Sequence, residues 1–98
     1  MYIALQYTYY VDVIYVPTPL GKKIKSIQNL FDEWLYDKTN DHGNWVIIDG
    51  EKVAVSFDSN TFIEYINEYH LTDGEGKAYV TDFELQNVPD ICFTTLFF

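Results

Sequence analysis

Hydrophobic and polar residues alternate with a period of two along two long stretches of the chain, which predicts β-strands. In residues 3–15 the inward positions are Tyr, Val, Ile and Leu, side chains that favour strands. At roughly 3.3 Å per residue this strand would be about 40 Å long, so we expect a bend, a bulge or an overhang near Tyr10 to Asp12. Residues 77–85 alternate in the same way. Residues 91–98 are apolar on both faces, as in a strand that is fully covered or packs on a partner.

Residues 45–57 predict a β-hairpin around Asp49-Gly50, because a tight type I′ turn needs positive φ at two positions. A two-residue loop fixes the pairing of the flanking residues: Ile48 with Glu51, Val46 with Val53, and Trp45 with Ala54. The same register gathers five apolar residues on one face, which we expect to lie in the core: Val46, Ile48, Val53, Val55 and Phe57.

Two segments show the 3.6-residue period of amphipathic helices. The stripe of the first is Ile27, Leu30, Phe31, Trp34 and Leu35, and the buried side of the second is Phe62, Ile63, Ile66 and Tyr69. We expect Ser26 to cap the first helix, which then ends in residues 38–43. Asp58 is placed to cap the second, with Phe57 and Phe62 at the spacing of a hydrophobic staple.

The order strand, helix, hairpin, helix, strand predicts one α+β domain over residues 1–98. With the added C-terminal strand the order is βαββαβ(β), in which an antiparallel sheet carries two helices on one face. This is the order of a ferredoxin-like sandwich, and a different α+β arrangement remains open.

The chain is strongly acidic, with fifteen acids, six lysines, no arginine and a net charge of −9. Fourteen of the acids but three of the lysines follow residue 28. A chain without a guanidinium group is poorly equipped to bind phosphate, so we expect a basic protein as partner and no direct contact with nucleic acid. The single cysteine fits a reducing compartment, and no secretion signal or membrane span is evident, so we expect a cytoplasmic protein.

The motifs of common active sites and cofactor sites are missing from the sequence. The predicted strand 51–57 has one aromatic residue and no arginine, whereas an RNA-recognition domain carries a basic and aromatic signature on this strand. Two acidic loops, 37–43 and 73–84, resemble calcium loops but place other residues at ligand positions. His42 and His70 have no metal-ligand partner at helical or hairpin spacing, and Cys92 lies in an apolar strand. We therefore expect no enzyme, no metal and no cofactor.

The acids themselves are the candidate partner-binding residues. Glu33 and Asp37 lie one helical turn apart, and so do Glu64 and Glu68. Like charges at this spacing repel by about 0.2–0.5 kcal/mol. The full set is Glu33, Asp37, Asp41, Asp49, Glu51, Glu64, Glu68, Asp73 and Glu75. The competing interpretation is that this charge only keeps the domain soluble. It leaves unexplained why arginine is absent and why the acids gather after residue 28.

In size, charge and lack of catalytic motifs, the chain resembles the small acidic inhibitors made by phages and mobile elements, such as anti-CRISPR and DNA-mimic proteins. This resemblance implies an inhibitor in the bacterial cytoplasm that covers the basic nucleic-acid-binding surface of an enzyme. Two alternatives stay open. One is an immunity protein that neutralises a basic nuclease toxin. The other is a structural or adaptor subunit with aromatic strands as interfaces, including a homodimer through the C-terminal strand.

Overall fold

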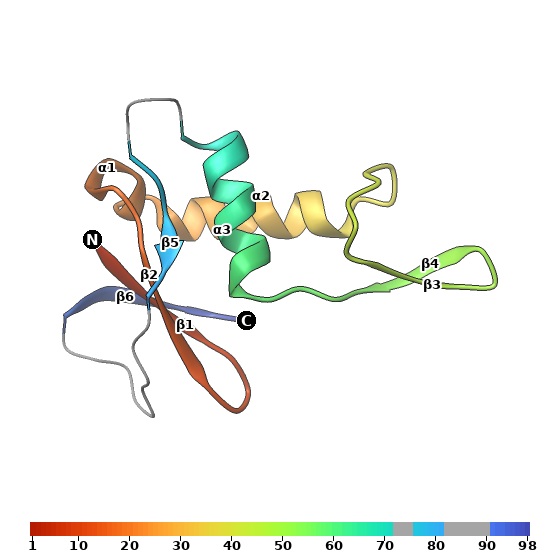
Figure 1. The fold of residues 1–98 in the computed structure, drawn as a ribbon, viewed down its shortest axis with the longest axis horizontal. Helices are drawn as coiled ribbons and strands as arrows, with labels where there is room; N and C mark the ends of the chain where they lie inside the picture. Colours follow the sequence, from red (N-terminus) through yellow and green to blue (C-terminus); the bar gives the residue numbers. More distant parts are fainter. Residues whose placement is uncertain (72–75, 82–90) are drawn as a thin grey trace.

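The computed structural model describes residues 1–71, 76–81 and 91–98 of the chain. It shows an α+β fold, as predicted, with extents of 45 × 33 × 21 Å (Figure 1). The elements in chain order are β1 (Tyr2–Gln6), β2 (Val11–Tyr15), α1 (Thr18–Gly21), α2 (Ile24–Tyr36), β3 (Trp45–Ile48), β4 (Glu51–Val55), α3 (Ser59–Tyr69), β5 (Tyr79–Val80) and β6 (Cys92–Phe97).

The main sheet has the strand order β5-β2-β1-β6 and is mixed. The strand pairs β1–β2 and β2–β5 are antiparallel, whereas β6 lies parallel to β1. The expectation of an antiparallel sheet is therefore wrong. The ferredoxin-like arrangement is not confirmed either, because β3 and β4 form a separate two-stranded sheet.

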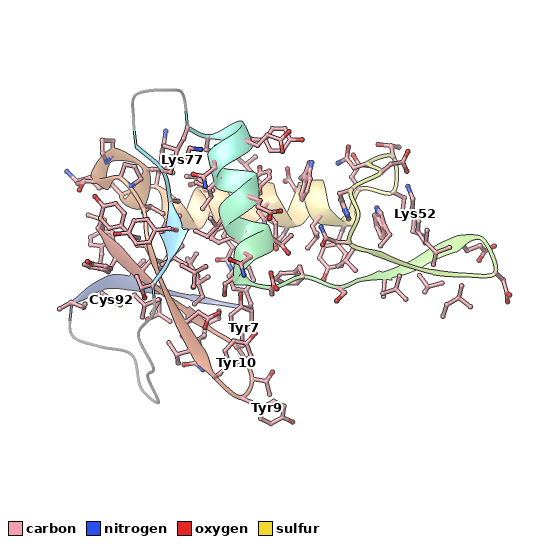
Figure 2. The ribbon with its side chains drawn as sticks, in the orientation of Figure 1. Tyr7, Tyr9, Tyr10, Lys52, Lys77 and Cys92 are labelled. Carbon is pink, nitrogen blue, oxygen red and sulfur yellow. The ribbon has the colours of Figure 1, made fainter. Side chains whose placement is uncertain are left out.

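The long N-terminal strand is in fact a hairpin of β1 and β2, so the predicted bend is a complete reversal of the chain. The turn is closed by the Tyr7 N–H, which donates to the Tyr10 carbonyl at 2.9 Å, and the two rings stack at 4.6 Å. Tyr9 lies at the tip and is 94% exposed (Figure 2). The turn residues include no Gly, Pro, Asn or Asp, so the usual sequence signal of a reversal is missing.

Helix α2 begins at Ile24, so Ser26 is inside the helix and the predicted cap is wrong. The N-cap residue is Lys23, which makes no capping hydrogen bond. Ile24 is 1% exposed and lies one turn before Ile27, so the buried stripe extends past Ser26. Burial of this additional side chain decides where the helix starts.

Helix α3 begins as predicted, with Asp58 as its N-cap. The Asp58 carboxylate accepts from the Thr61 N–H at 3.0 Å, and the Thr61 hydroxyl accepts from the Asp58 N–H at 3.2 Å, which completes a capping box. Both staple residues contact Phe31, with ring centroids 5.6 Å from Phe57 and 5.0 Å from Phe62. Tyr69, expected on the buried side, is 54% exposed.

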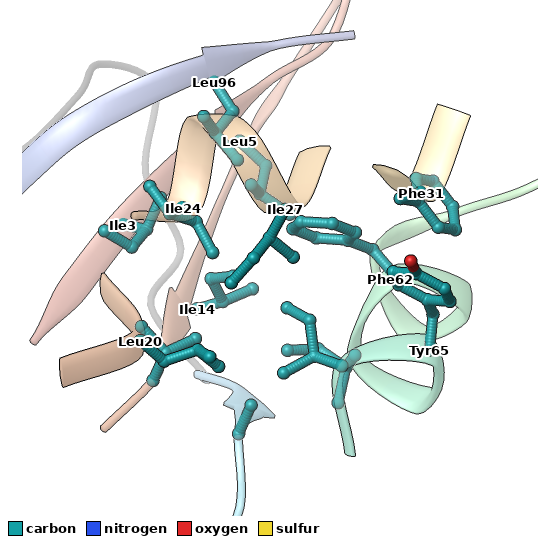
Figure 3. Close-up of a cluster of buried hydrophobic side chains, with 14 of the residues drawn as sticks. Ile3, Leu5, Ile14, Leu20, Ile24, Ile27, Phe31, Phe62, Tyr65 and Leu96 are labelled. Atoms are coloured by element: carbon teal, nitrogen blue, oxygen red, sulfur yellow. The ribbon is translucent and has the colours of Figure 1, made fainter. Parts of the chain in front are cut away.

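One buried cluster joins the main sheet to all three helices (Figure 3). Ile3, Leu5 and Ile14 supply its sheet side and are fully buried. Phe31 of α2 is also fully buried and contacts Phe98 at the chain end, with ring centroids 6.3 Å apart.

The C-terminal strand β6 is only half covered by the rest of the described chain. Leu96 is 1% exposed and belongs to the core, whereas Phe93 and Phe97 are 56% and 74% exposed. Within the described part of one copy, residues 91–98 are therefore not covered on both faces, and packing of this segment on a partner stays a prediction. Of the strand predicted over residues 77–85, the structure shows Tyr79–Val80, and residues 82–85 lie outside the described part.

The hairpin of β3 and β4, which we call the arm, projects away from the main sheet (Figure 1). Its turn is confirmed: Asp49 and Gly50 have φ of 53° and 80°, and Ile48 pairs with Glu51. Ile47 then pairs with Lys52, still in the predicted register. Between Ile47 and Val46 a bulge shifts the register, so that Val46 pairs with Ala54 and Trp45 with Val55, one residue away from the predicted partners.

The predicted core face of the arm is confirmed for Val55 and Phe57, which are partly buried and pack against the core, and is wrong for the other three residues. Val46, Ile48 and Val53 are 39%, 58% and 52% exposed, and Ile47 on the other side of the strand is 60% exposed. The alternating pattern correctly indicates strands, but it cannot tell which surface, if any, the apolar side chains are packed against.

Candidate functional site: an acidic cleft lined with aromatic rings

A cleft of about 410 Å³ lies between α3, the C-terminal half of α2 and the loop that leads into the arm. Its volume is within the range of ordinary ligand pockets. Four rings and three carboxylates contribute to its lining: Trp34, His42, Tyr65, Tyr69, Asp41, Glu64 and Glu68. This combination of π-faces and negative charge distinguishes the cleft from an apolar pocket.

The rings form a continuous row from α3 to the base of the arm. Tyr65 and Tyr69 of α3 lie 5.2 Å apart, and their centroids are 5.1 and 5.8 Å from Trp34. The row continues from Trp34 to His42 at 4.8 Å, and from His42 to Trp45 at 5.1 Å. The His42 and Trp45 planes are 9° apart, so these two rings are stacked.

Hydrogen bonds to the backbone hold the middle of this row in place. His42 Nε2 lies 2.7 Å from the Leu35 carbonyl, which can only accept, so Nε2 donates and Nδ1 is left to accept from the Asn44 N–H at 3.3 Å. The Asn40 side chain donates to the Trp34 carbonyl at 2.9 Å, and the Trp45 indole donates to the Asn40 carbonyl at 2.7 Å. The His42 and Trp45 rings are thus held in place by the chain itself before any ligand arrives.

At the arm end of the row, the chain supplies its own cation. Lys52 Nζ lies 5.5 Å from the centre of the Trp45 ring and 2.6 Å from the Asp41 carboxylate (Figure 2). It also donates to the Lys38 carbonyl at 2.6 Å. The hydrogen bond from Lys52 and its charge lower the pKa of Asp41. An ammonium group held between a ring and a carboxylate is therefore already part of this site.

At the α3 end, by contrast, two carboxylates flank the rings without a lysine. Glu64 and Glu68 are exposed, and they lie one helical turn apart. Among the described residues, no lysine lines the cleft. Burial, followed by the charges of Tyr69 and Glu33, raises the pKa of the Tyr65 phenol. The negative potential at this end is therefore not neutralised from within the lining.

The structure divides the nine predicted acids into separate groups. Glu64, Glu68 and Asp41 line the cleft, and Glu33 is close enough to affect Tyr65. Asp37 accepts from the Thr39 hydroxyl and N–H at 2.7 and 2.9 Å, which lowers its pKa and gives it a local role in the turn. The others are Asp49 and Glu51 at the exposed tip of the arm, and Asp73 and Glu75 outside the described residues.

Sequence reasoning missed the aromatic part of the site. A signal was present, because the dipeptide Glu-Tyr occurs at residues 64–65 and again at 68–69, one turn apart on the same helix. The helical period places Trp34 on the core stripe, and the structure shows that it packs against the core and lines the cleft as well.

The rest of the described chain offers no comparable chemistry. No group of three or more His, Cys, Asp and Glu side chains in that part could hold a metal ion. Burial raises the pKa of the Cys92 thiol. A smaller cavity of about 320 Å³ lies beside the start of α2, where Lys22, Lys23 and Lys25 gather next to Phe93.

No protein-family model, curated protein or solved structure matches the chain. Among the described residues, none of the helices combines the length and apolar character needed to cross a membrane. The assignment of function therefore depends on the geometry of the cleft.

Proposed function

We propose that the protein is a small acidic inhibitor that binds the basic nucleic-acid-binding surface of an enzyme, in the manner of an anti-CRISPR or DNA-mimic protein. One observation carries the proposal: Asp41, Glu64 and Glu68 lie around one preorganised cleft lined with aromatic rings. Tyr and Trp are frequent anchors of protein interfaces, and carboxylates attract the lysines and arginines of nucleic-acid-binding channels.

The positions of the charges on the helices also favour a role in binding over a role in solubility alone. Helix α2 begins among lysines and carries Glu33 in its last turn, and α3 carries Glu68 in its last turn. Each of these charges opposes the helix dipole, at a cost of about 0.3–1 kcal/mol for an exposed group. The same net charge, placed at the opposite helix ends, would keep the protein soluble without this cost.

Two alternatives use the same molecule differently. An immunity protein against a basic nuclease toxin would need the same acidic cleft. A structural or adaptor subunit is favoured by the apolar side chains that the fold leaves exposed, namely Ile47 and Ile48 on the arm and Phe93 and Phe97 on β6. In that case β6 is the natural place for contact with a second copy.

Capture from bacterial lysate at low salt, followed by mass spectrometry, tests the proposal with three versions of the protein as bait. The first is the natural chain and the second is the double variant E64K/E68K. The third, D49K/E51K, changes the net charge by the same amount at the tip of the arm, away from the cleft. We expect the natural chain and D49K/E51K to enrich the same nucleic-acid-handling enzyme, and E64K/E68K to lose it.

Two results would contradict the proposal. If both charge variants lose the captured enzyme equally, net charge alone is responsible and the cleft has no special role. If the enriched protein does not bind nucleic acid, the partner class is wrong; a nuclease toxin would instead support the immunity alternative.

A further inference from the structure

We propose that the α3 end of the cleft binds the guanidinium group of an arginine side chain from the partner. This rests on the proposed function, because it assumes that the partner is a basic protein. It specifies which chemical group enters the cleft and which residues receive it: Glu64, Glu68, Tyr69 and Trp34.

The first argument is the cation that the chain itself places in the ring row. Lys52 lies over Trp45 and pairs with Asp41, so one end of the row already holds a positive group between a ring and a carboxylate. Across all described residues, this is the one lysine found both over a ring and paired with an acid. The row is thus built from components that stabilise cations.

The second argument is that the same components recur at the α3 end with no lysine among them. Tyr65, Tyr69 and Trp34 lie within 6 Å of one another by their ring centroids. Glu64 and Glu68 line the cleft beside these rings. Tyr69 is 54% exposed and lines the cleft, so it is accessible to an incoming group. Charge complementarity therefore selects a cation from outside the molecule.

The third argument concerns the shape of that cation. A guanidinium is planar, stacks on aromatic faces, and presents a fork of N–H donors to carboxylates. Two glutamates one turn apart, next to a row of rings, match both properties together. A lysine ammonium is a strongly hydrated point charge and gains less from a ring face. The cleft should accordingly prefer arginine to lysine.

The test is an NMR titration of the isotope-labelled full chain with N-acetyl-L-arginine methylamide. The indole N–H signal of Trp34 reports on the part of the row next to Tyr65 and Tyr69, and that of Trp45 reports on the arm end; the variant W45F assigns the two signals. Matched probes are the lysine and citrulline derivatives, since citrulline has nearly the shape of arginine without its charge. We expect a saturable shift of the Trp34 signal, with arginine binding at least about fivefold more tightly than citrulline.

Two double variants distinguish binding in the cleft from general attraction of a cation by the negative charge of the protein. E64Q/E68Q removes the carboxylates and should weaken arginine binding at least about fivefold. D49N/E51Q removes the same amount of charge at the arm tip and should leave it unchanged. The amide spectra of both variants, compared with the spectrum of the natural chain, show whether each variant is folded. If E64Q/E68Q is not folded, Y69L tests the contribution of the ring independently.

Equal affinity for the arginine and lysine derivatives would overturn the assignment to arginine. Unchanged binding by E64Q/E68Q and Y69L would overturn the site. The two proposals fail separately: a cleft that binds arginine, in a protein that captures no nucleic-acid-handling enzyme, contradicts the proposed function alone. Capture that depends on Glu64 and Glu68, without arginine binding, contradicts this inference alone.

Discussion

Tyr7, Ser59 and Asp12 form a chain of hydrogen bonds that joins the β1–β2 hairpin to the start of α3. Ser59 donates to the Asp12 carboxylate, so its oxygen accepts from the Tyr7 hydroxyl at 2.8 Å. Ser59 is 3% exposed, and burial raises the pKa of Tyr7 to about 12. The fold therefore holds Tyr7 as a neutral donor.

The raised pKa of Tyr7 predicts a loss of stability at alkaline pH. In the unfolded chain this phenol ionises near its ordinary pKa of 10.0, whereas in the fold it stays protonated up to about 12. Its contribution is therefore fully present below about pH 10 and is lost as the pH rises from 10 towards 12. Urea unfolding should show the natural chain more stable than Y7F at neutral pH by about 1 kcal/mol.

That difference should shrink as the pH is raised towards 12, because only the natural chain carries the Tyr7 phenol. The matched control is Y9F, whose ring is 94% exposed and makes no comparable contact. It should behave like the natural chain at every pH. A difference between the natural chain and Y7F that stays constant with pH would mean that Tyr7 is not held neutral by the fold.

Among the elements, the arm packs against the hydrophobic core at its base, through Val55, whereas its turn and the side chains of Ile48 and Val53 are exposed. This changes what a substitution in its turn should do. Gly50 has a φ of +80°, and a β-branched residue there costs more than about 1 kcal/mol. Because the arm projects from the body, we expect G50V to open the arm locally. Hydrogen exchange should then become faster in β3 and β4 but stay slow in the main sheet. A global loss of stability would instead show that the arm folds as one unit with the core.

The two sides of β6 should respond differently to substitution. Leu96 is in the core, so L96A should lower the free energy of unfolding by about 2–5 kcal/mol. Phe97 is 74% exposed, so F97S should leave stability nearly unchanged. Sedimentation of the natural chain and F97S tests the adaptor alternative as well. Self-association that is seen with the natural chain and lost in F97S would support a dimer through β6. A large loss of stability in F97S would contradict the placement of this side chain.

Local backbone chemistry explains which elements the sequence could predict. The turn at Asp49-Gly50 and the cap at Asp58 depend on a few adjacent residues, and both are present. The parallel pairing of β6 with β1 joins the two ends of the chain, and no local pattern encodes it. Glu64 and Glu68 could be chosen from the sequence as exposed helix residues. The row from Tyr69 to Trp45, by contrast, exists only after three segments come together.

On the scale of the whole molecule, positive and negative charges are separated along α2. Three lysines gather at its N-terminal end, near the main sheet. The acidic cleft lies at its C-terminal half, beside Trp34. The arm also lies towards that end of the helix (Figure 1). Such a separation orients the protein as it approaches a charged surface, and the effect is screened over about 8–10 Å at ordinary salt. We therefore expect the cleft end to meet a basic partner first.

Displacement of DNA from the captured enzyme, measured with the natural chain, D49K/E51K and E64K/E68K across a range of salt concentrations, tests the central claim most directly. The natural chain and D49K/E51K should displace DNA strongly at low salt and weakly at high salt. E64K/E68K should fail to displace it. Its melting temperature should be equal to or above that of the natural chain, because the reversal lowers the net negative charge of −9 and puts a positive charge in the last turn of α3, where the helix dipole favours one. If E64K/E68K displaces DNA as well as the natural chain, the acidic cleft is not the inhibitory surface.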